Sequence, residues 1–201
     1  MSQTVERKSN SERTDLSDAM MLESAIRLIV EKGSDKTTLK EVGELAGYSR
    51  GLAGYRFGSK AGLFEFIVRS VGEQWVARLS KATKGKSGLD AIASALDEHA
   101  TMCLEASDKI RAFYILWFES IGVQSKVKVV IHSIHERRRQ DVVSWLKDSD
   151  LDESVSAQDI AGQFNASVLG IAYHWLANPQ DHAGLLKLHQ NLKHSMSHYF
   201  T

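Results

Sequence analysis

Apolar residues recur at three- and four-residue intervals along most of this chain, which is the spacing that places them on one face of an α-helix. The pattern first becomes clear at Leu22, Ile26 and Ile29. No stretch alternates apolar and polar positions between Asn-Gly or Asp-Gly turns, and the one proline is Pro179. The pattern therefore predicts an all-α fold.

The polar stretches predict where the helices begin and end. We expect a flexible arm over residues 1–15, which are polar and mixed in charge. The first helix is expected to run from Leu16 to near Gly33, because glycine is common just past a helix end. Residues 82–88 and 148–156 are expected to be loops. The remaining patterns predict further helices, about nine in all, including those over 60–79, 89–106, 108–122, 125–147, 156–177 and 182–200.

Two short segments between these regions have the features of a helical pair. Thr38 and Glu41 have the spacing of a capping box at a helix N-terminus, and Gly47 is suited to end that helix. Ser49 and Ser59 are candidate caps for the next two helices. Two short helices joined by a tight turn form a helix-turn-helix, whose second helix fits the major groove of DNA.

The distribution of charge agrees with a local nucleic-acid surface. Lys plus Arg and Asp plus Glu each total 25, so the formal net charge is zero. Residues 36–60, however, include five lysines and arginines but only two carboxylates. Because phosphate attraction needs only a local basic patch, this segment is the candidate DNA-binding surface. We expect a head over 16–64 with its helix-turn-helix at about 38–57, and a helical body over 65–201.

The residues of the head also resemble those of a known family. The runs TTL at 37–39, LAGYSRGL at 45–52 and YRFGSK at 55–60 carry the resemblance, together with Gly33. Over about residues 16–64 the chain closely resembles the DNA-binding head of the TetR family of transcriptional regulators. The resemblance implies a three-helix head that binds double-stranded DNA, and a helical body that binds a small ligand and dimerises.

The resemblance and the chemistry of the side chains together assign candidate DNA contacts. Tyr55 and Lys60 match positions that hold phosphates, and Arg50 has the reach to contact guanine or a phosphate. Arg56 stands where the family usually has His, and Ala61 where it usually has Glu. The full candidate set is Thr38, Ser49, Arg50, Leu52, Tyr55, Arg56 and Lys60.

The last two long helices are candidates for a homodimer interface. Each carries apolar residues at helical spacing, and the first of them is apolar on two faces, so a second layer must cover it. The alternative is that these residues are ordinary monomer core. The candidate interface residues are Ile171, Trp175, Leu185, Leu188, Leu192, Met196 and Tyr199.

Aromatic residues in the body form a candidate pocket for a small molecule. Aromatic walls with a few polar groups are typical of such sites, although residues of this kind are also common in cores. Few charges fall on these helix faces, which favours a mainly apolar or neutral ligand. The candidate pocket residues are His99, Met102, Phe113, Tyr114, Trp117, Phe118, Trp145, Phe164 and His174.

Other sites and locations are disfavoured. The single cysteine, Cys103, excludes a Cys-based zinc finger, and no cofactor or metal is expected. The pairs His132/His135 and His194/His198 have metal-compatible spacing, but we interpret them as surface or interface histidines. The longest apolar run, 112–118, is too short for a membrane helix, and we expect a cytoplasmic protein.

Two further motifs are set aside. The run GKS at 85–87 ends like a phosphate loop, but Ser80 stands where the first glycine belongs. The basic cluster at 136–139 is interpreted as a solvated helix face.

The sequence as a whole predicts a ligand-responsive DNA-binding regulator, not an enzyme, acting as a homodimeric repressor released from its operator by a small molecule. The alternatives are a helical small-molecule-binding protein or enzyme without specific DNA binding, and a protein-interaction module.

Overall fold

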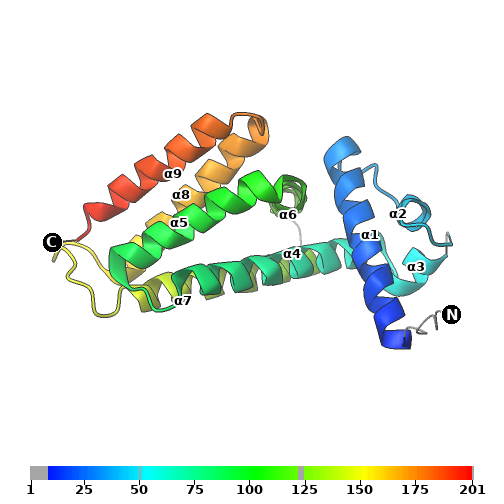
Figure 1. Ribbon diagram of the computed structural model, residues 1–201, viewed down its shortest axis with the longest axis horizontal. Coiled ribbons are helices and arrows are strands. Elements are labelled where there is room, and N and C mark those ends of the chain that lie inside the picture. The colour runs from blue at the N-terminus through cyan, green and yellow to red at the C-terminus, as the bar shows by residue number, and fades with distance from the viewer. Residues whose placement is uncertain (1–8, 50, 122–124, 201) are drawn as a thin grey trace, which may run out of the picture. The chain divides into compact units, whose positions relative to one another are not determined.

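The computed structural model describes residues 9–49, 51–121 and 125–200 (Figure 1). Over these residues the fold is all-α, as predicted, and Leu151 and Phe200 form one isolated antiparallel bridge. The nine helices of this part of the chain are α1 (Asn10–Lys32), α2 (Leu39–Leu45), α3 (Leu52–Phe57), α4 (Lys60–Thr83), α5 (Gly88–Glu105), α6 (Ser107–Glu119), α7 (Lys126–Trp145), α8 (Ala157–Ala177) and α9 (His182–Ser197).

The chain divides into two compact units, and the boundary lies between Ile67 and Val68, within α4. The first unit, here called the head, contains α1, α2, α3 and the start of α4. The second unit, the body, contains the rest of α4 and the helices from α5 to α9. The boundary lies three residues after the expected one at 64.

Helix α1 begins earlier than its apolar pattern predicts. Ser9 caps it, because the Ser9 hydroxyl accepts from the Glu12 backbone N–H at 3.2 Å and the Glu12 carboxylate accepts from the Ser9 N–H at 2.6 Å. The expected arm over 1–15 is therefore wrong for residues 10–15, whereas 1–8 lie outside the described residues. The first turns of α1 are exposed and polar, so their hydrophobicity does not reveal them.

The head has a small apolar core to which each of its helices contributes. Ile29 of α1, Val42 of α2 and Ala53 of α3 are buried, and Leu63 of α4 closes the core. Figure 1 shows α2 and α3 beside α1 within the head. Helices as short as α2 and α3 are not stable alone, so burial of these side chains supplies most of their stability.

The body is built around the buried indole of Trp75 on α4. The rings of His99, Phe113 and Tyr114 lie 5.3, 5.5 and 5.7 Å from it, centroid to centroid. Helix α5 packs against α9 and α6, and α7 packs against α8. At Gly72 a Cβ atom would lie 2.5 Å from Cδ1 of Ile134, so the missing side chain lets α4 and α7 approach closely.

None of the helices in the described residues is both long enough and apolar enough to cross a membrane.

Candidate nucleic-acid interface

The turn between α2 and α3 depends on a cap and a glycine. Thr38 is the N-cap of α2: its hydroxyl oxygen accepts from the Glu41 backbone N–H at 3.3 Å and its O–H donates to the Glu41 carboxylate at 2.7 Å. Gly47 adopts a φ of +79°, in the left-handed region that favours glycine. The Tyr48 N–H then donates to the Gly43 carbonyl at 2.9 Å, which closes the turn.

The start of α3 differs from the expectation. Its N-cap is Gly51, without a side-chain cap, and the Ser49 carbonyl accepts from the Leu52 N–H at 3.0 Å. Ser49 as the capping side chain is therefore wrong, and its side chain stays exposed. Arg50, the candidate base contact, lies outside the described residues.

The outer face of α3 carries an aromatic side chain that nothing covers. Tyr55 is 89% exposed, and its hydroxyl has no hydrogen-bond partner among the described residues. Ala53 on the same helix is fully buried and Leu52 is half-buried, so α3 has a clear inner and outer face. Thr38, at the start of α2, is also exposed. An uncovered phenol is suited to contact a partner outside the chain.

The Lys60 ammonium is held in a defined place at the start of α4. Nζ donates to the Asp35 carbonyl at 2.7 Å and lies 5.6 Å from the centre of the Phe64 ring. Ser59 acts as the expected cap, because its hydroxyl accepts from the Gly62 N–H at 3.1 Å. Because Lys60 has no carboxylate partner among the described residues, its charge is available to an external anion.

Arg56, in contrast, is engaged within the head. Its guanidinium donates through Nε to Oδ1 of Asp18 on α1 at 2.7 Å and through Nη2 to Oδ2. The hydrogen bonds and charge of Asp18 raise the pKa of Arg56. This bidentate pair joins α3 to α1, and it neutralises a cation that the sequence assigned to DNA. The two residues are 38 positions apart, so no local pattern indicates the pair.

The candidate pocket residues do not line one chamber. His99, Trp145 and Phe164 line a small cavity of about 10 Å³ between α4, α5, α7 and α8. His174 is exposed and lines a separate groove of about 440 Å³ along α8 and α9. Phe118 is half-buried, and the other candidates lie in the aromatic core of the body: Met102, Phe113, Tyr114 and Trp117.

Most of the candidate dimer residues are covered by their own chain. Five are buried within the single body: Ile171, Trp175, Leu185, Leu192 and Met196. Leu188 and Tyr199 are half-buried. For the five buried residues the packing corresponds to the monomer-core alternative. The large apolar side chains that α8 and α9 leave exposed are instead Tyr173 and Leu186, at 64% and 43%.

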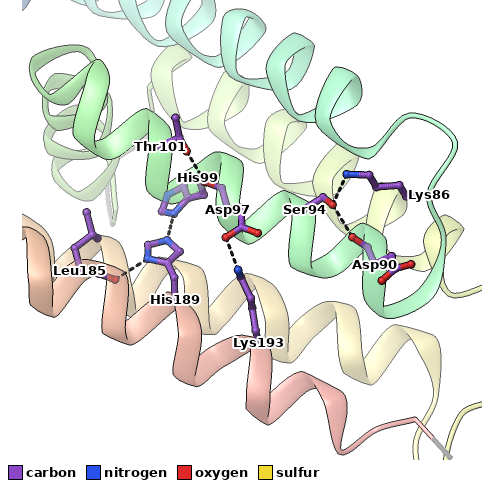
Figure 2. A network of polar contacts seen from close by, with 9 residues as sticks. All are labelled: Lys86, Asp90, Ser94, Asp97, His99, Thr101, Leu185, His189 and Lys193. Carbon is purple, nitrogen blue, oxygen red and sulfur yellow. Dashed lines mark hydrogen bonds and ion pairs between the residues drawn. The ribbon is translucent and has the colours of Figure 1, made fainter.

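The body also contains a buried polar network that sequence patterns reveal only in part. Figure 2 shows His99 on α5 facing His189 on α9, with the ring nitrogens 2.8 Å apart. The second nitrogen of His99 lies 2.9 Å from the Tyr114 hydroxyl. Tyr114 in turn hydrogen-bonds Arg138, which is 5% exposed. The interpretation of 136–139 as a solvated face is therefore wrong for Arg138.

The remaining histidines and the cysteine form no cluster of metal ligands in the described residues. The rings of His194 and His198 are exposed and 4.9 Å apart. His135 packs edge-on against Trp117 at 4.2 Å, and burial lowers its pKa to about 4. Burial raises the pKa of the Cys103 thiol to about 12, so this cysteine is unreactive at neutral pH.

Comparison with known proteins gives the head a clear match. Residues 21–67 match the family model described as bacterial regulatory proteins, tetR family. Over 91 residues the chain is 33% identical to an uncharacterized HTH-type transcriptional regulator, YfiR, of Bacillus subtilis. That alignment covers 45% of this chain and 44% of the relative, so the chain matches less than half of the relative's length.

Solved structures extend the likeness to the whole fold. A transcriptional regulator from Rhodococcus sp. Rha1 matches 90% of this chain and 94% of its own, with a TM-score of 0.77 and 19% identity. AibR, solved with isovaleryl coenzyme A and operator DNA, matches 92% of this chain and 100% of its own, with a TM-score of 0.74 and 15% identity. At these identities the likeness concerns the fold.

Proposed function

We propose that this chain, whose head matches the TetR family model, is a regulator of that family, and that it binds operator DNA as a homodimer and controls transcription in response to a small molecule. The observation that carries the proposal is the outer face of α3, where the Tyr55 side chain is 89% exposed. A helix of this kind fits the major groove of B-form DNA.

The proposed contacts divide into those that position the head and those that read bases. Tyr55, Lys60 and Thr38 hold phosphates, which fixes the register of the head on the duplex. Arg50, Leu52 and Ser49 lie at or before the start of α3, the part of a recognition helix that contacts base edges. Arg56 takes a different part from the expected one: its pair with Asp18 occupies the guanidinium within the head and withholds its charge from DNA.

The dimer remains part of the proposal for a physical reason. One α3 helix reads too few base pairs to select an operator, whereas two heads read two successive half-sites. The exposed Tyr173 and Leu186 on α8 and α9 offer an apolar surface on which two bodies would associate. The buried residues of the same helices then support that surface from beneath.

The response to ligand is proposed as a population shift. A small, mainly apolar molecule would bind the body best in a conformation whose heads do not fit the operator, and repression would then be released. Coupling of this kind typically amounts to about 1–3 kcal/mol. That AibR was solved in complex with isovaleryl coenzyme A and operator DNA supports the proposal, as does the description of the Rhodococcus and Bacillus proteins as transcriptional regulators.

The deciding experiment measures binding of the full chain to its own upstream DNA by fluorescence anisotropy. Specific binding that weakens steeply with salt is expected, because phosphate contacts release counterions. Tyr55→Phe should weaken binding to every sequence by a similar factor, whereas Arg50→Ala should also reduce discrimination between sequences. Equal affinity for upstream and unrelated DNA, unchanged by both substitutions, would overturn the proposal.

A further inference from the structure

The hydrogens of the buried network can be assigned from one end. His189 Nδ1 lies 2.8 Å from the Leu185 carbonyl oxygen, which only accepts, so Nδ1 carries the proton (Figure 2). In a neutral imidazole the other nitrogen is then an acceptor, so His99 Nδ1–H donates to His189 Nε2. His99 Nε2 is left to accept from the Tyr114 hydroxyl. Burial lowers the pKa of both imidazoles, which agrees with two neutral rings.

This assignment leaves Arg138 as the charged end of a neutral network. The Tyr114 oxygen, having donated its own proton to His99, accepts from the guanidinium. The guanidinium carbon of Arg138 also lies over the Trp75 ring, 4.2 Å from its centroid. Both partners are neutral. Among the described residues no carboxylate forms a salt bridge with Arg138, and Asp141 acts on its charge only through space.

A buried cation without a salt bridge is costly unless a further group pairs with it. A protein that needed only packing at this position would be better served by an uncharged side chain, since replacing buried charges by apolar groups is often neutral or stabilising. Arg138 also lines the cavity between α4, α5, α7 and α8, together with Leu79, Val142 and Phe164. The charge thus lies at the wall of an otherwise apolar space.

Asp141 lies one turn further along α7 than Arg138, and its carboxylate lines the same cavity. It is half-buried, and burial raises its pKa despite the attraction of Arg137 and Arg138. Of the residues that line the cavity, Asp141 and Trp145 are partly exposed and the others are buried. These two residues are one turn apart on the same face of α7. A ligand would therefore reach the cavity past these two side chains.

We infer that the cavity beside Arg138 binds a small organic acid, with its carboxylate on the guanidinium of Arg138 and its apolar part against Leu79, Val142 and Phe164. This inference rests on the proposed function, for which it names the class of effector, and it adds a negative charge to the apolar ligand expected from sequence. The cavity is about 10 Å³, so Trp145 and Asp141 must move to admit the ligand. Tyr114 then shares Arg138 with the ligand.

The first test compares acids with their neutral amides on the full chain by isothermal titration calorimetry. The probes are benzoate with benzamide and octanoate with octanamide. At least one acid should bind about tenfold or more tightly than its amide, because only the acid forms charge-assisted hydrogen bonds. Equal binding of acid and amide, or binding of neither acid, would overturn the inference.

Substitutions on α7 then locate the site. Arg138→Met keeps the aliphatic volume on Trp75 and should abolish the preference for the acid, while Arg137→Met, on the exposed side of the same helix, should leave it unchanged. Asp141→Asn should strengthen binding of the acid several-fold, because it removes a like charge. If Asp141 were instead the counter-ion of Arg138, Asp141→Asn would weaken the fold and leave the preference where it was, contradicting the inference.

Should Arg138→Met not fold, by circular dichroism, the acid–amide comparison and Asp141→Asn still decide the matter. Binding to upstream DNA is measured separately. Specific DNA binding without any preference for acids would overturn this inference alone. Binding of an acid by a chain that ignores its upstream DNA would overturn the proposed function alone.

Discussion

The head and the body place their basic and aromatic side chains in opposite ways. In the head, Tyr55 is uncovered and Lys60 has no carboxylate partner among the described residues, so both are available to a large polyanion. In the body, Trp75 is 1% exposed and Arg138 is 5% exposed, so the same two kinds of side chain face inward. A surface suits a ligand as large as a duplex, whereas a buried cation suits one small enough to be enclosed.

The largest difference between the head and the body is expected in the stability effects of substituting Tyr55 and Trp75. Trp75→Ala should lower the free energy of unfolding of the body by about 3–5 kcal/mol, because it leaves a cavity among three rings and removes the face that covers Arg138. Tyr55→Ala should change stability by no more than about 0.5 kcal/mol. Chemical denaturation followed by circular dichroism measures both. A similar loss for the two variants would contradict the inward and outward assignment.

Low pH should lower the stability of the body more than that of the head, because all eight histidines lie in the body. Burial holds the pKa of His99, His189 and His135 below the ordinary value, to about 4 for His135. The unfolded body binds protons at these sites that the folded body does not, so its stability is full above about pH 6.5 and falls as the pH drops towards 4.

Thermal unfolding at several pH values measures this loss. His135→Asn should make the melting temperature less dependent on pH between about 6.5 and 4, because one of the three buried imidazoles is removed. His194→Asn, at an exposed site, is the matched control and should leave the dependence as it is. A melting temperature that is flat over this range in the unmodified chain would contradict the buried neutral imidazoles.

The salt dependence of DNA binding should distinguish surface cations of the head from surface cations of the body. Lys60→Ala should reduce the slope of log affinity against log salt by about 0.9, because the head then neutralises one phosphate fewer. Lys128→Ala, which removes an exposed lysine of the body, should leave the slope unchanged. Anisotropy titrations at a series of salt concentrations measure both. The opposite ranking of the two variants would place the DNA on the body instead of on the head.

The smallest effect is expected on breaking the ion pair between Arg56 and Asp18, which engages a cation of the head within its own unit. Asp18→Asn should cost no more than about 1 kcal/mol of stability, because the Arg56 side chain is 45% exposed and the pair is screened by water. The substitution should also raise affinity for DNA, since it frees a cation. Denaturation and anisotropy measure the two effects. A fall in affinity would mean that the pair mainly sets the position of α3.

Much of the head could be predicted because its signals are local. Thr38 caps α2 and Gly47 forms the turn, and both depend on residues within a few positions. Ser59 likewise caps the start of α4 as expected. The beginning of α1 was missed because the capping box of Ser9 precedes exposed polar turns, which hydrophobic spacing does not detect.

The body could be predicted only in outline. Helical spacing indicates that α8 and α9 are amphipathic, but it does not indicate whether Trp175 or Met196 faces a partner or its own chain. The basic run at 136–139 is a further example. Its arginines look alike in sequence, and helix packing buries Arg138 while leaving Arg137 exposed.

By itself the sequence determined the helical class, the helix-turn-helix and the family resemblance, because periodicity, caps and turn glycines act over a few residues. Tertiary structure alone decided which charged side chains are available to bind a ligand or DNA. It joined Arg56 to Asp18 across 38 residues and brought His99, His189 and Tyr114 from three helices to Arg138. Burial and pairing of a charge depend on which distant helices pack around it, and no local pattern of residues contains that information.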